Sequence, residues 1–290
     1  MNETVTIRQG KLRDCSDLFT VYQTTRWDRK NNDSGYRNVE EVKDDHRGSG
    51  FSNWGWLVAE SDGVVIGEIV AATERNPSIG KVGVIQSLDV DARHQKRGIG
   101  MALSLAAEKA LAKKGAERVV VVTPPEAYNY WMKADYFARG PLANISTTPS
   151  RIKSNSTTGL KAVQRRVPDR LPPSARFSHF AVPGRLGNIV RMISNKKRVG
   201  KFVEFYTGSD LTGVGAVAKM DHGVAEFVVD SYERDDAKYS AMVSEVLSLA
   251  KMLNVHRIRG VVPKDQLERF SKSASWSVED SRDILVNKLL

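Results

Sequence analysis

The sequence predicts a mixed α/β (α+β) protein of two similar halves, each with a mostly antiparallel sheet flanked by helices. Three observations support this prediction. Short strand-like apolar runs are interspersed with longer helical patterns. One of these runs leads through a basic, glycine-containing turn into a helix at residues 82–114. The element order of the first half then recurs in the second half, and 290 residues suffice for two domains.

The elements of the first half follow from local patterns. The turn Ser61-Asp62-Gly63 separates two strand-like runs, and Asp-Gly in this position predicts a β-hairpin. An amphipathic stretch through Leu18 and Val21 predicts an early helix, and spaced leucines predict another at 101–114. Strands are expected at residues 5–8, 56–60, 64–70, 81–90 and 118–122, the last an unbroken β-branched run typical of a buried strand.

The turn Arg93–Gly100 has the properties of an anion site. A helix that begins directly after a strand presents backbone N–H groups without partners, and these attract phosphate. Gly98 and Gly100 allow a ligand to approach the main chain closely, while Lys96 and Arg97 add positive charge. The P-loop pattern is absent because Gly-Lys-Ser/Thr is missing, and the dinucleotide fingerprint is absent because its third glycine is missing. A pyrophosphate of another kind is therefore expected.

The segment Val90–Gly100 resembles the acetyl-CoA pyrophosphate loop of the GNAT superfamily of N-acetyltransferases. It carries the Gln-x-x-Gly-x-Gly pattern after a strand and before a helix, and it departs from the common family sequence only at Ala92, where proline is usual. The resemblance implies acetyl-CoA as co-substrate and a strand that splays from its neighbour to pair with the pantetheine arm. The cofactor-binding residues that it implies are Leu88, Asp89, Val90, Gln95, Lys96, Arg97, Gly98, Ile99, Gly100, Met101 and Trp131.

A second family signature is present in weaker form at residues 127–136. The family's catalytic tyrosine falls on Trp131, whose indole N–H is a donor only and cannot return a proton to a thiolate. Tyr128 and Tyr130 could take over this role. Alternatively, all three aromatic side chains pack in the core.

The resemblance implies that an amine attacks the thioester directly. A base must first remove a proton from the ammonium, and a donor must stabilise the oxyanion. The donor is expected to be a backbone N–H near Leu88. Val84 occupies the position where family members often carry a carboxylate, and Gln86 can position an amine or water but cannot titrate. Glu68 is the first candidate for the base, and Asp89 and Glu126 are alternatives. By the same resemblance, the candidate acceptor contacts are Trp27, Tyr36 and the acidic residues Glu40, Glu41, Asp44 and Asp45.

The second half repeats the element order with a changed loop. We expect a GNAT domain at residues 1–167, a linker at 168–183 and a degenerate GNAT-like domain at 184–290, similar in layout to mycothiol synthase. The loop at 231–238 has no glycine and carries paired acidic residues where an anion would lie, so this half is not expected to hold CoA. It is expected to brace the first domain or to wall its acceptor cleft.

Composition limits the alternatives without choosing among them. The single cysteine, Cys15, excludes an internal disulfide, and no histidine spacing suggests a metal, so no metal is expected. No apolar run approaches the roughly 20 residues that span a bilayer, and no signal peptide is apparent, so a cytoplasmic location is expected. The net charge of +10 suits an anionic cofactor, nucleic acid or an acidic partner. We therefore expect a CoA thioester and a small-molecule or peptide amine as partners, no membrane partner, and a monomer or homodimer. The alternatives are an acyl-CoA-binding protein without turnover and a basic nucleic-acid-binding protein.

Overall fold

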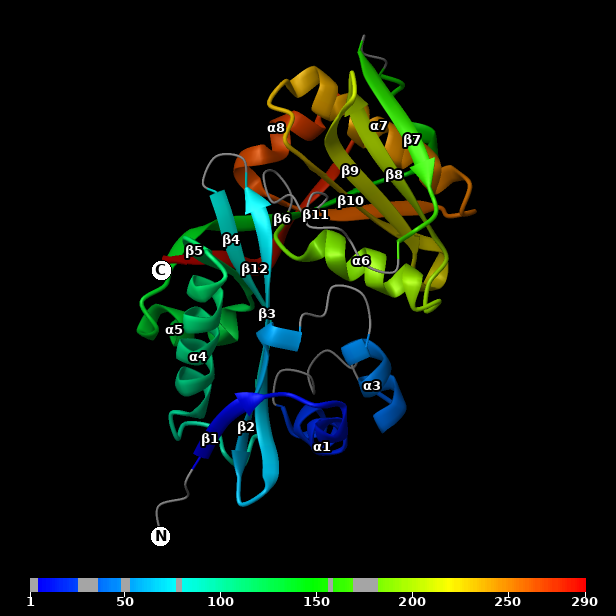
Figure 1. Ribbon diagram of the computed structural model, residues 1–290. Coiled ribbons are helices and arrows are strands. Elements are labelled where there is room, and N and C mark those ends of the chain that lie inside the picture. Colours follow the sequence, from blue (N-terminus) through cyan, green and yellow to red (C-terminus); the bar gives the residue numbers. More distant parts are fainter. Residues whose placement is uncertain (1–4, 26–35, 48–52, 77–79, 156–158, 169–181) are drawn as a thin grey trace.

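The computed structural model describes residues 5–25, 36–47, 53–76, 80–155, 159–168 and 182–290. It confirms the predicted mixed α/β architecture. Within these residues, twelve strands form one sheet that runs through both halves, in the order β1-β2-β3-β4-β5-β12-β6-β11-β10-β9-β8-β7 (Figure 1). Most neighbouring strands are antiparallel. The β4–β5 and β10–β11 pairs are parallel, each joined by a crossover helix.

The first half contains the predicted meander and crossover. Asp62 and Gly63 both have positive φ in the tight turn between β2 and β3, as an Asp-Gly hairpin requires. The elements are β1 (Val5–Gln9), α1 (Cys15–Thr24), α3 (Val39–Arg47), β2 (Trp56–Ser61), β3 (Val64–Asn76), β4 (Gly80–Val90), α4 (Ile99–Lys113), β5 (Arg118–Thr123), α5 (Pro125–Lys133) and β6 (Phe137–Thr147).

The second half repeats this order, which confirms the predicted internal duplication of elements. It contributes two elements that the sequence did not reveal as parts of this half: a first strand, β7, which pairs with β8, and a helix, α6, before the meander. The elements are β7 (Leu160–Arg165), α6 (Arg185–Ser194), β8 (Gly200–Thr207), β9 (Asp210–Lys219), β10 (Val224–Ser231), α7 (Asp236–Lys251), β11 (Arg257–Pro263), α8 (Leu267–Phe270) and β12 (Ser277–Leu289).

The two halves exchange strands at the centre of the sheet. β12 from the second half lies between β5 and β6 of the first, and it is antiparallel to both. β6 in turn pairs with β11 of the second half. The predicted boundaries at 167 and 184 remain a prediction, and most of the predicted linker lies outside the described residues. The pairing shows that each half completes its sheet with a strand from the other.

Helices cover both faces of the sheet in each half (Figure 1). Leu103, Ala107 and Leu111 of α4, spaced four residues apart, are fully buried against one face of the first half together with α5. α1 and α3 cover the opposite face. In the second half, α7 packs on one face and α6 on the other. No helix in the described part of the chain is long and apolar enough to cross a membrane.

Candidate functional site

The strand β4 separates from β5 halfway along its length. The two strands pair only from Val82 with Arg118 to Ile85 with Val121. Gln86 lies at a bulge, because Ile85 pairs with Ala71 of β3 while Ser87 pairs with Val70. From Gln86 to Val90, β4 pairs with β3 alone, so its alternate N–H and C=O groups face the opening toward β5. Leu88, Asp89 and Val90 lie in this separated segment, and alternate residues among them present main-chain groups toward the opening.

The loop after β4 is held by its own side chains. The Asp91 N–H donates to the Ile66 carbonyl at 2.9 Å. The Asp91 carboxylate accepts from the Arg93 guanidinium, at 2.7 Å for Nη2, and from the Arg93 N–H, and these bonds hold its pKa below the usual range. The Gln95 amide donates to the Val90 carbonyl at 2.9 Å. Gln95 thus fixes the loop, and in this structure its amide N–H group is directed at the protein.

The start of α4 presents its amides outward. Gly98 is the N-cap residue with φ +83°, and a Cβ at this position would meet no atom within 4 Å. No side chain caps the helix, so the first-turn N–H groups of Ile99, Gly100 and Met101 have no intrahelical partner. The Ile99 side chain is buried in the core and contributes to the site only through its main chain. With exposed Lys96 and Arg97 beside it, this helix end is suited to an anion.

Tyr130 lies against the first turn of α4. A Cβ at Gly100 would be 3.4 Å from its ring, and its hydroxyl is 2.7 Å from the Ser104 hydroxyl. Burial raises the pKa of Tyr130 to about 12, so the phenol is protonated at neutral pH. Tyr128 is partly buried on the same helix, at the edge of the same core. Tyr130 is therefore the candidate aromatic residue that the structure places beside the anion site.

Trp131 is part of the core. Its side chain is 4% exposed, and its ring makes edge-to-face contacts with Tyr130 and Tyr136 at centroid distances of 5.0 and 4.8 Å. Of the two interpretations that the sequence left open for this residue, burial supports packing. Whether Trp131 also contacts a bound cofactor remains a prediction.

Glu68 is buried in a hydrogen-bond network between the sheet and the helices α1 and α3. Its carboxylate accepts from the Tyr22 hydroxyl and, at 3.0 Å, from the Trp56 indole N–H. His46 Nε2 lies 3.1 Å from the same carboxylate, and His46 Nδ1 contacts the Val42 carbonyl. This carboxylate is 1% exposed and already engaged by three partners. As a base, it would have to give up bonds that hold the two helices.

The two alternative carboxylates are also constrained. Asp89 is 4% exposed and is the cross-strand neighbour of Glu68 in β3. Glu126 forms an ion pair with Arg282 at 3.0 Å. Glu68 and Asp89 thus lie together on one face of the sheet, whereas Glu126 lies at the start of α5. Trp27 lies outside the described residues. Tyr36 stacks at an angle on Tyr22, with 5.0 Å between ring centroids.

The second half contributes residues near the splay that sequence analysis missed. A Cβ at Gly184, just before α6, would lie 3.3 Å from the Val84 side chain and 4.0 Å from that of Gln86. The Gly184 N–H donates to Glu74 at 2.9 Å. On the other side, β12 places Asp283 next to Ile284, which pairs with Thr123 at the end of β5. No local sequence signal identifies these residues, because their position depends on pairing across more than 90 residues.

The equivalent helix end in the second half is closed by its own side chain. Asp235 caps α7, and its carboxylate accepts from the Ala237 N–H at 2.7 Å and the Lys238 N–H at 3.2 Å. Arg269 pairs with Asp236 and donates to the Arg234 carbonyl. A carboxylate thus occupies the place of an anionic ligand. This supports the prediction that the second half holds no CoA.

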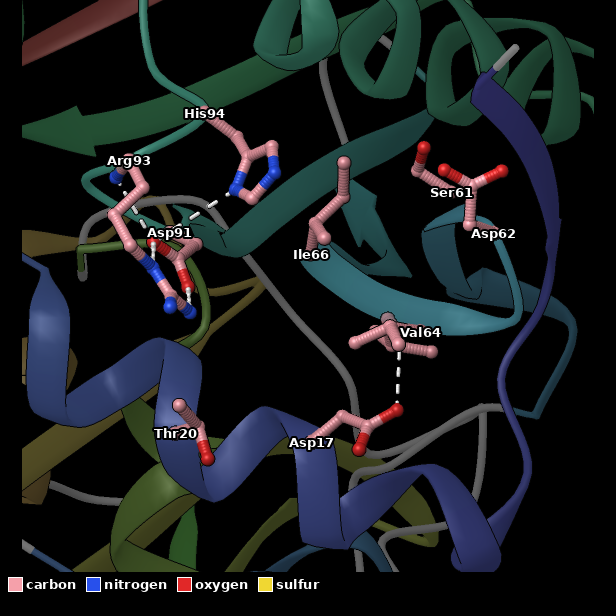
Figure 2. A pocket seen from close by; sticks show the side chains of 10 residues that line it. Asp17, Thr20, Ser61, Asp62, Val64, Ile66, Asp91, Arg93 and His94 are labelled. Carbon is pink, nitrogen blue, oxygen red and sulfur yellow. Dashed lines mark hydrogen bonds and ion pairs between the residues drawn. The ribbon is translucent and has the colours of Figure 1, made fainter. Parts of the chain in front are cut away.

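A separate pocket of about 320 Å³ lies beside the start of the loop. Figure 2 shows Arg93 and His94 turned toward Asp91 on one side of it, with Asp17 and Thr20 of α1 below. The Asp17 carboxylate accepts from the Val65 N–H at 2.9 Å, so it is used in the fold. Among the described residues, no group of three or more His, Cys, Asp or Glu side chains could hold a metal ion.

Comparison with known proteins identifies the family of the first half. Residues 15–135 match the acetyltransferase (GNAT) family model. This part of the chain is therefore a GNAT acetyltransferase domain, which confirms the family predicted from the loop. Comparison with curated proteins gives no match. The likeness to mycothiol synthase remains a prediction.

Solved structures extend the likeness in fold to the whole chain. A putative acetyltransferase from Pyrococcus horikoshii is 14% identical, with 99% of this chain and 89% of that chain covered and a TM-score of 0.54. A GCN5-related N-acetyltransferase from Kribbella flavida is 12% identical, with 99% of this chain and 71% of that chain covered and a TM-score of 0.58. A tandem GNAT protein from the clavulanic acid biosynthesis pathway is 11% identical, with 99% of this chain and 98% of that chain covered and a TM-score of 0.54. The chain has the tandem GNAT fold.

Proposed function

We propose that this protein transfers an acetyl group from acetyl-CoA to a primary amine by direct attack on the thioester. One observation carries the proposal: β4 separates from β5 after Ile85 and leads directly to the uncapped amides of α4. A thioester with a long, amide-bearing arm and a diphosphate needs both features in this order. The GNAT family of the first half supports acetyl transfer.

In the proposed complex, the start of α4 binds the diphosphate of CoA and the end of β4 binds the pantetheine arm. The N–H groups of Gly98, Ile99, Gly100 and Met101 would hold the diphosphate, and the charges of Lys96 and Arg97 would add to the attraction. The main-chain groups of Leu88–Val90 that face the opening, other than the Val90 carbonyl bonded to Gln95, would pair with the pantetheine arm as a further strand does. Gly98 suits close approach because the space beside its Cα is open.

The chemistry then needs an oxyanion donor and a proton for the leaving thiolate. A backbone N–H near Leu88 is directed toward the opening between β4 and β5 and would stabilise the oxyanion. Gln86, at the bulge, would position the amine or a water. Tyr130 is protonated at neutral pH, as a phenol with a pKa of about 12 must be, and would donate a proton to the leaving thiolate, with Tyr128 as the alternative.

A thiol-release assay tests the proposal. The protein is incubated with acetyl-CoA and, separately, polyamines, amino acids, aminoglycosides and peptide N-termini, and free thiol is followed with a thiol reagent. We expect release that depends on one class of amine, together with formation of the acetylated amine by mass spectrometry. CoA binding without release for any amine would instead identify a non-catalytic acyl-CoA-binding protein. Salt-dependent RNA retention that CoA does not affect would favour a nucleic-acid binder.

A further inference from the structure

The strand exchange places one carboxylate of the second half beside the acceptor side of the first. Pairing of β12 with β6 is irregular between Asp280 and Ile284, and Asp283 is the last residue of this irregular segment. Ile284 pairs with Thr123 at the end of β5, close to where β4 has separated. Asp283 therefore lies near the place where β4 separates from β5, although its strand belongs to the second half.

The face on which Asp283 lies follows from its neighbours. Leu285, two residues further along β12, packs with Val84 and Val182, and residues two apart share one face of a strand. The Asp283 carboxyl also interacts electrostatically with Arg185 of α6. Arg185 follows Gly184, where a Cβ would lie 3.3 Å from the Val84 side chain and 4.0 Å from that of Gln86. Asp283 thus lies on the same face as Val84 and Gln86, neither of which can titrate at neutral pH.

The two arginines near Asp283 neutralise its negative charge only in part, because each of them is also paired with a glutamate. Arg185 of α6 is bonded to Glu226 at 2.9 Å, and Arg282 of β12 is bonded to Glu126 of α5 at 3.0 Å. The side chain of Asp283 is partly buried, and burial raises its pKa above that of an ordinary aspartate, with the two arginines opposing this shift and Glu126 adding to it. A carboxylate of raised pKa is a stronger base than a solvated one.

We propose that Asp283 accepts the proton of the acceptor ammonium, directly or through one water, so that the second half completes the active site of the first. This inference rests on the proposed function. The first proton of the ammonium passes from nitrogen to the Asp283 carboxylate, the free amine forms the N–C bond, and the C–S bond breaks to release the thiolate. The nitrogen loses its second proton as the amide forms, and this loss balances the proton that the thiolate takes up, from Tyr130 in the proposed function. Where the three strands pair, the main chains of β4 and β12 are about 10 Å apart across β5, and β4 moves away from β5 beyond Ile85, which leaves room for a side chain, an amine and a water.

Asp283 fits this role better than Glu68, Glu126 and Asp89, the last of which is only 4% exposed. Glu68 is engaged by Tyr22, His46 and Trp56, and Glu126 is paired with Arg282. Asp283, by contrast, is partly accessible, and the main-chain bond at its position, from its own N–H to the Ser281 hydroxyl, leaves the carboxylate available. A base must be reachable by its substrate, and this separates Asp283 from Glu68.

The test compares Asp283→Asn with Asp280→Asn, a control on the same strand that removes an exposed ion pair with Lys264. Thiol release is measured from pH 5 to 9 with the best amine of the screen, and acetyl-CoA affinity is measured by calorimetry. We expect Asp283→Asn to slow release about 100-fold or more and to leave the affinity unchanged. In the wild type the rate should rise with pH as Asp283 ionises. This rise of the rate with pH should disappear in Asp283→Asn and persist in Asp283→Glu and Asp280→Asn.

Thermal unfolding separates a base from a structural carboxylate. Because the folded-state pKa of Asp283 is raised, its ionisation at neutral pH disfavours the folded state, so Asp283→Asn should raise the melting temperature at pH 7 while it lowers activity. Unchanged release and pH profile in Asp283→Asn would overturn the inference and leave the proposed function intact. A parallel loss of stability and activity would also overturn it. Absence of release by the wild type with every amine, despite CoA binding, would overturn the proposed function and this inference together.

Discussion

The two crossover helices of this protein begin in opposite ways. α4 begins at Gly98, in the left-handed region, with open space beside it and first-turn amides that no side chain caps. α7 begins at Asp235, in extended conformation, with a carboxylate that accepts from two of those amides. The same position in a repeated fold is thus open to an external anion in one half and filled by an internal one in the other. The residue at the helix start, Gly98 in one half and Asp235 in the other, is one local difference between the two.

The comparison also shows what the second half has kept. Its helix start is closed, yet its last strand lies inside the first half's sheet, and α6 reaches Val84 and Gln86. We therefore predict that the second half contributes to the first half's site and binds no cofactor of its own. The following predictions test this division of roles.

The largest effect is expected when the first half is expressed alone. Residues 1–167 lack β12, so β5 and β6 would lose the strand that pairs with both, and β7 would lose β8. Unsatisfied main-chain groups on β5 and β6 should prevent a stable fold. Circular dichroism and thermal unfolding should show no cooperative transition. A soluble, cooperatively folding fragment that binds CoA would contradict the interdependence of the halves.

A transplanted cap tests the helix-start comparison directly. Gly98→Asp gives α4 the carboxylate that α7 has, whereas Gly98→Asn has the same shape without the charge. Both carry the backbone cost of a side chain at positive φ. We expect Gly98→Asp to weaken acetyl-CoA binding about 100-fold, or about 3 kcal/mol, relative to wild type in calorimetry, and Gly98→Asn to weaken it less. Equal affinities for the two variants would show that charge at this position does not control binding.

Substitution of Glu68 sharpens the contrast between the buried carboxylate of the first half and Asp283. Tyr22, His46 and Trp56 all contact the Glu68 carboxylate, and Glu68→Gln replaces one of its acceptor oxygens with an N–H donor. The free energy of unfolding should therefore fall by about 2–4 kcal/mol. Urea unfolding measures this loss, and Glu60→Gln, at a part-exposed carboxylate on β2, serves as the control. If Glu68→Gln kept full stability but lost the pH dependence of thiol release, Glu68 would be the base after all.

The smallest effect is expected at the closed helix start. Asp235→Asn weakens the cap of α7 and should lower the melting temperature by about 2 °C at pH 7. The bonds from Lys238 and Ala237 hold the pKa of Asp235 below its usual value. Its contribution is therefore present above about pH 4 and is lost as pH falls through the folded-state pKa. Melting curves at pH 7 and pH 3 should show a larger difference at the higher pH. A gain of CoA affinity would be unexpected, since Arg234 and Asp236 remain.

Local features of the fold and site were readable from the sequence. The anion loop, the hairpin and the repeated order depend on residues close in the chain, such as Gly98 and the Asp62-Gly63 turn. The engagement of Glu68 was not readable, because Tyr22, His46 and Trp56 meet it only after α1 and α3 pack on the sheet. Nor was the position of Asp283, because strand pairing between distant segments leaves no local pattern. The long-range contacts decide which carboxylate can act.

The placement of β12 has a consequence for how the protein is made. Residues 118–147 leave the ribosome well before residues 277–289, so β5 and β6 must wait, with exposed edges, for a strand that is translated more than 100 residues later. Such distant pairing slows folding, and open strand edges are sites of association between chains. We therefore expect nascent chains stalled before residue 277 to depend on chaperones, and the cofactor loop to mature only after the last strand is inserted.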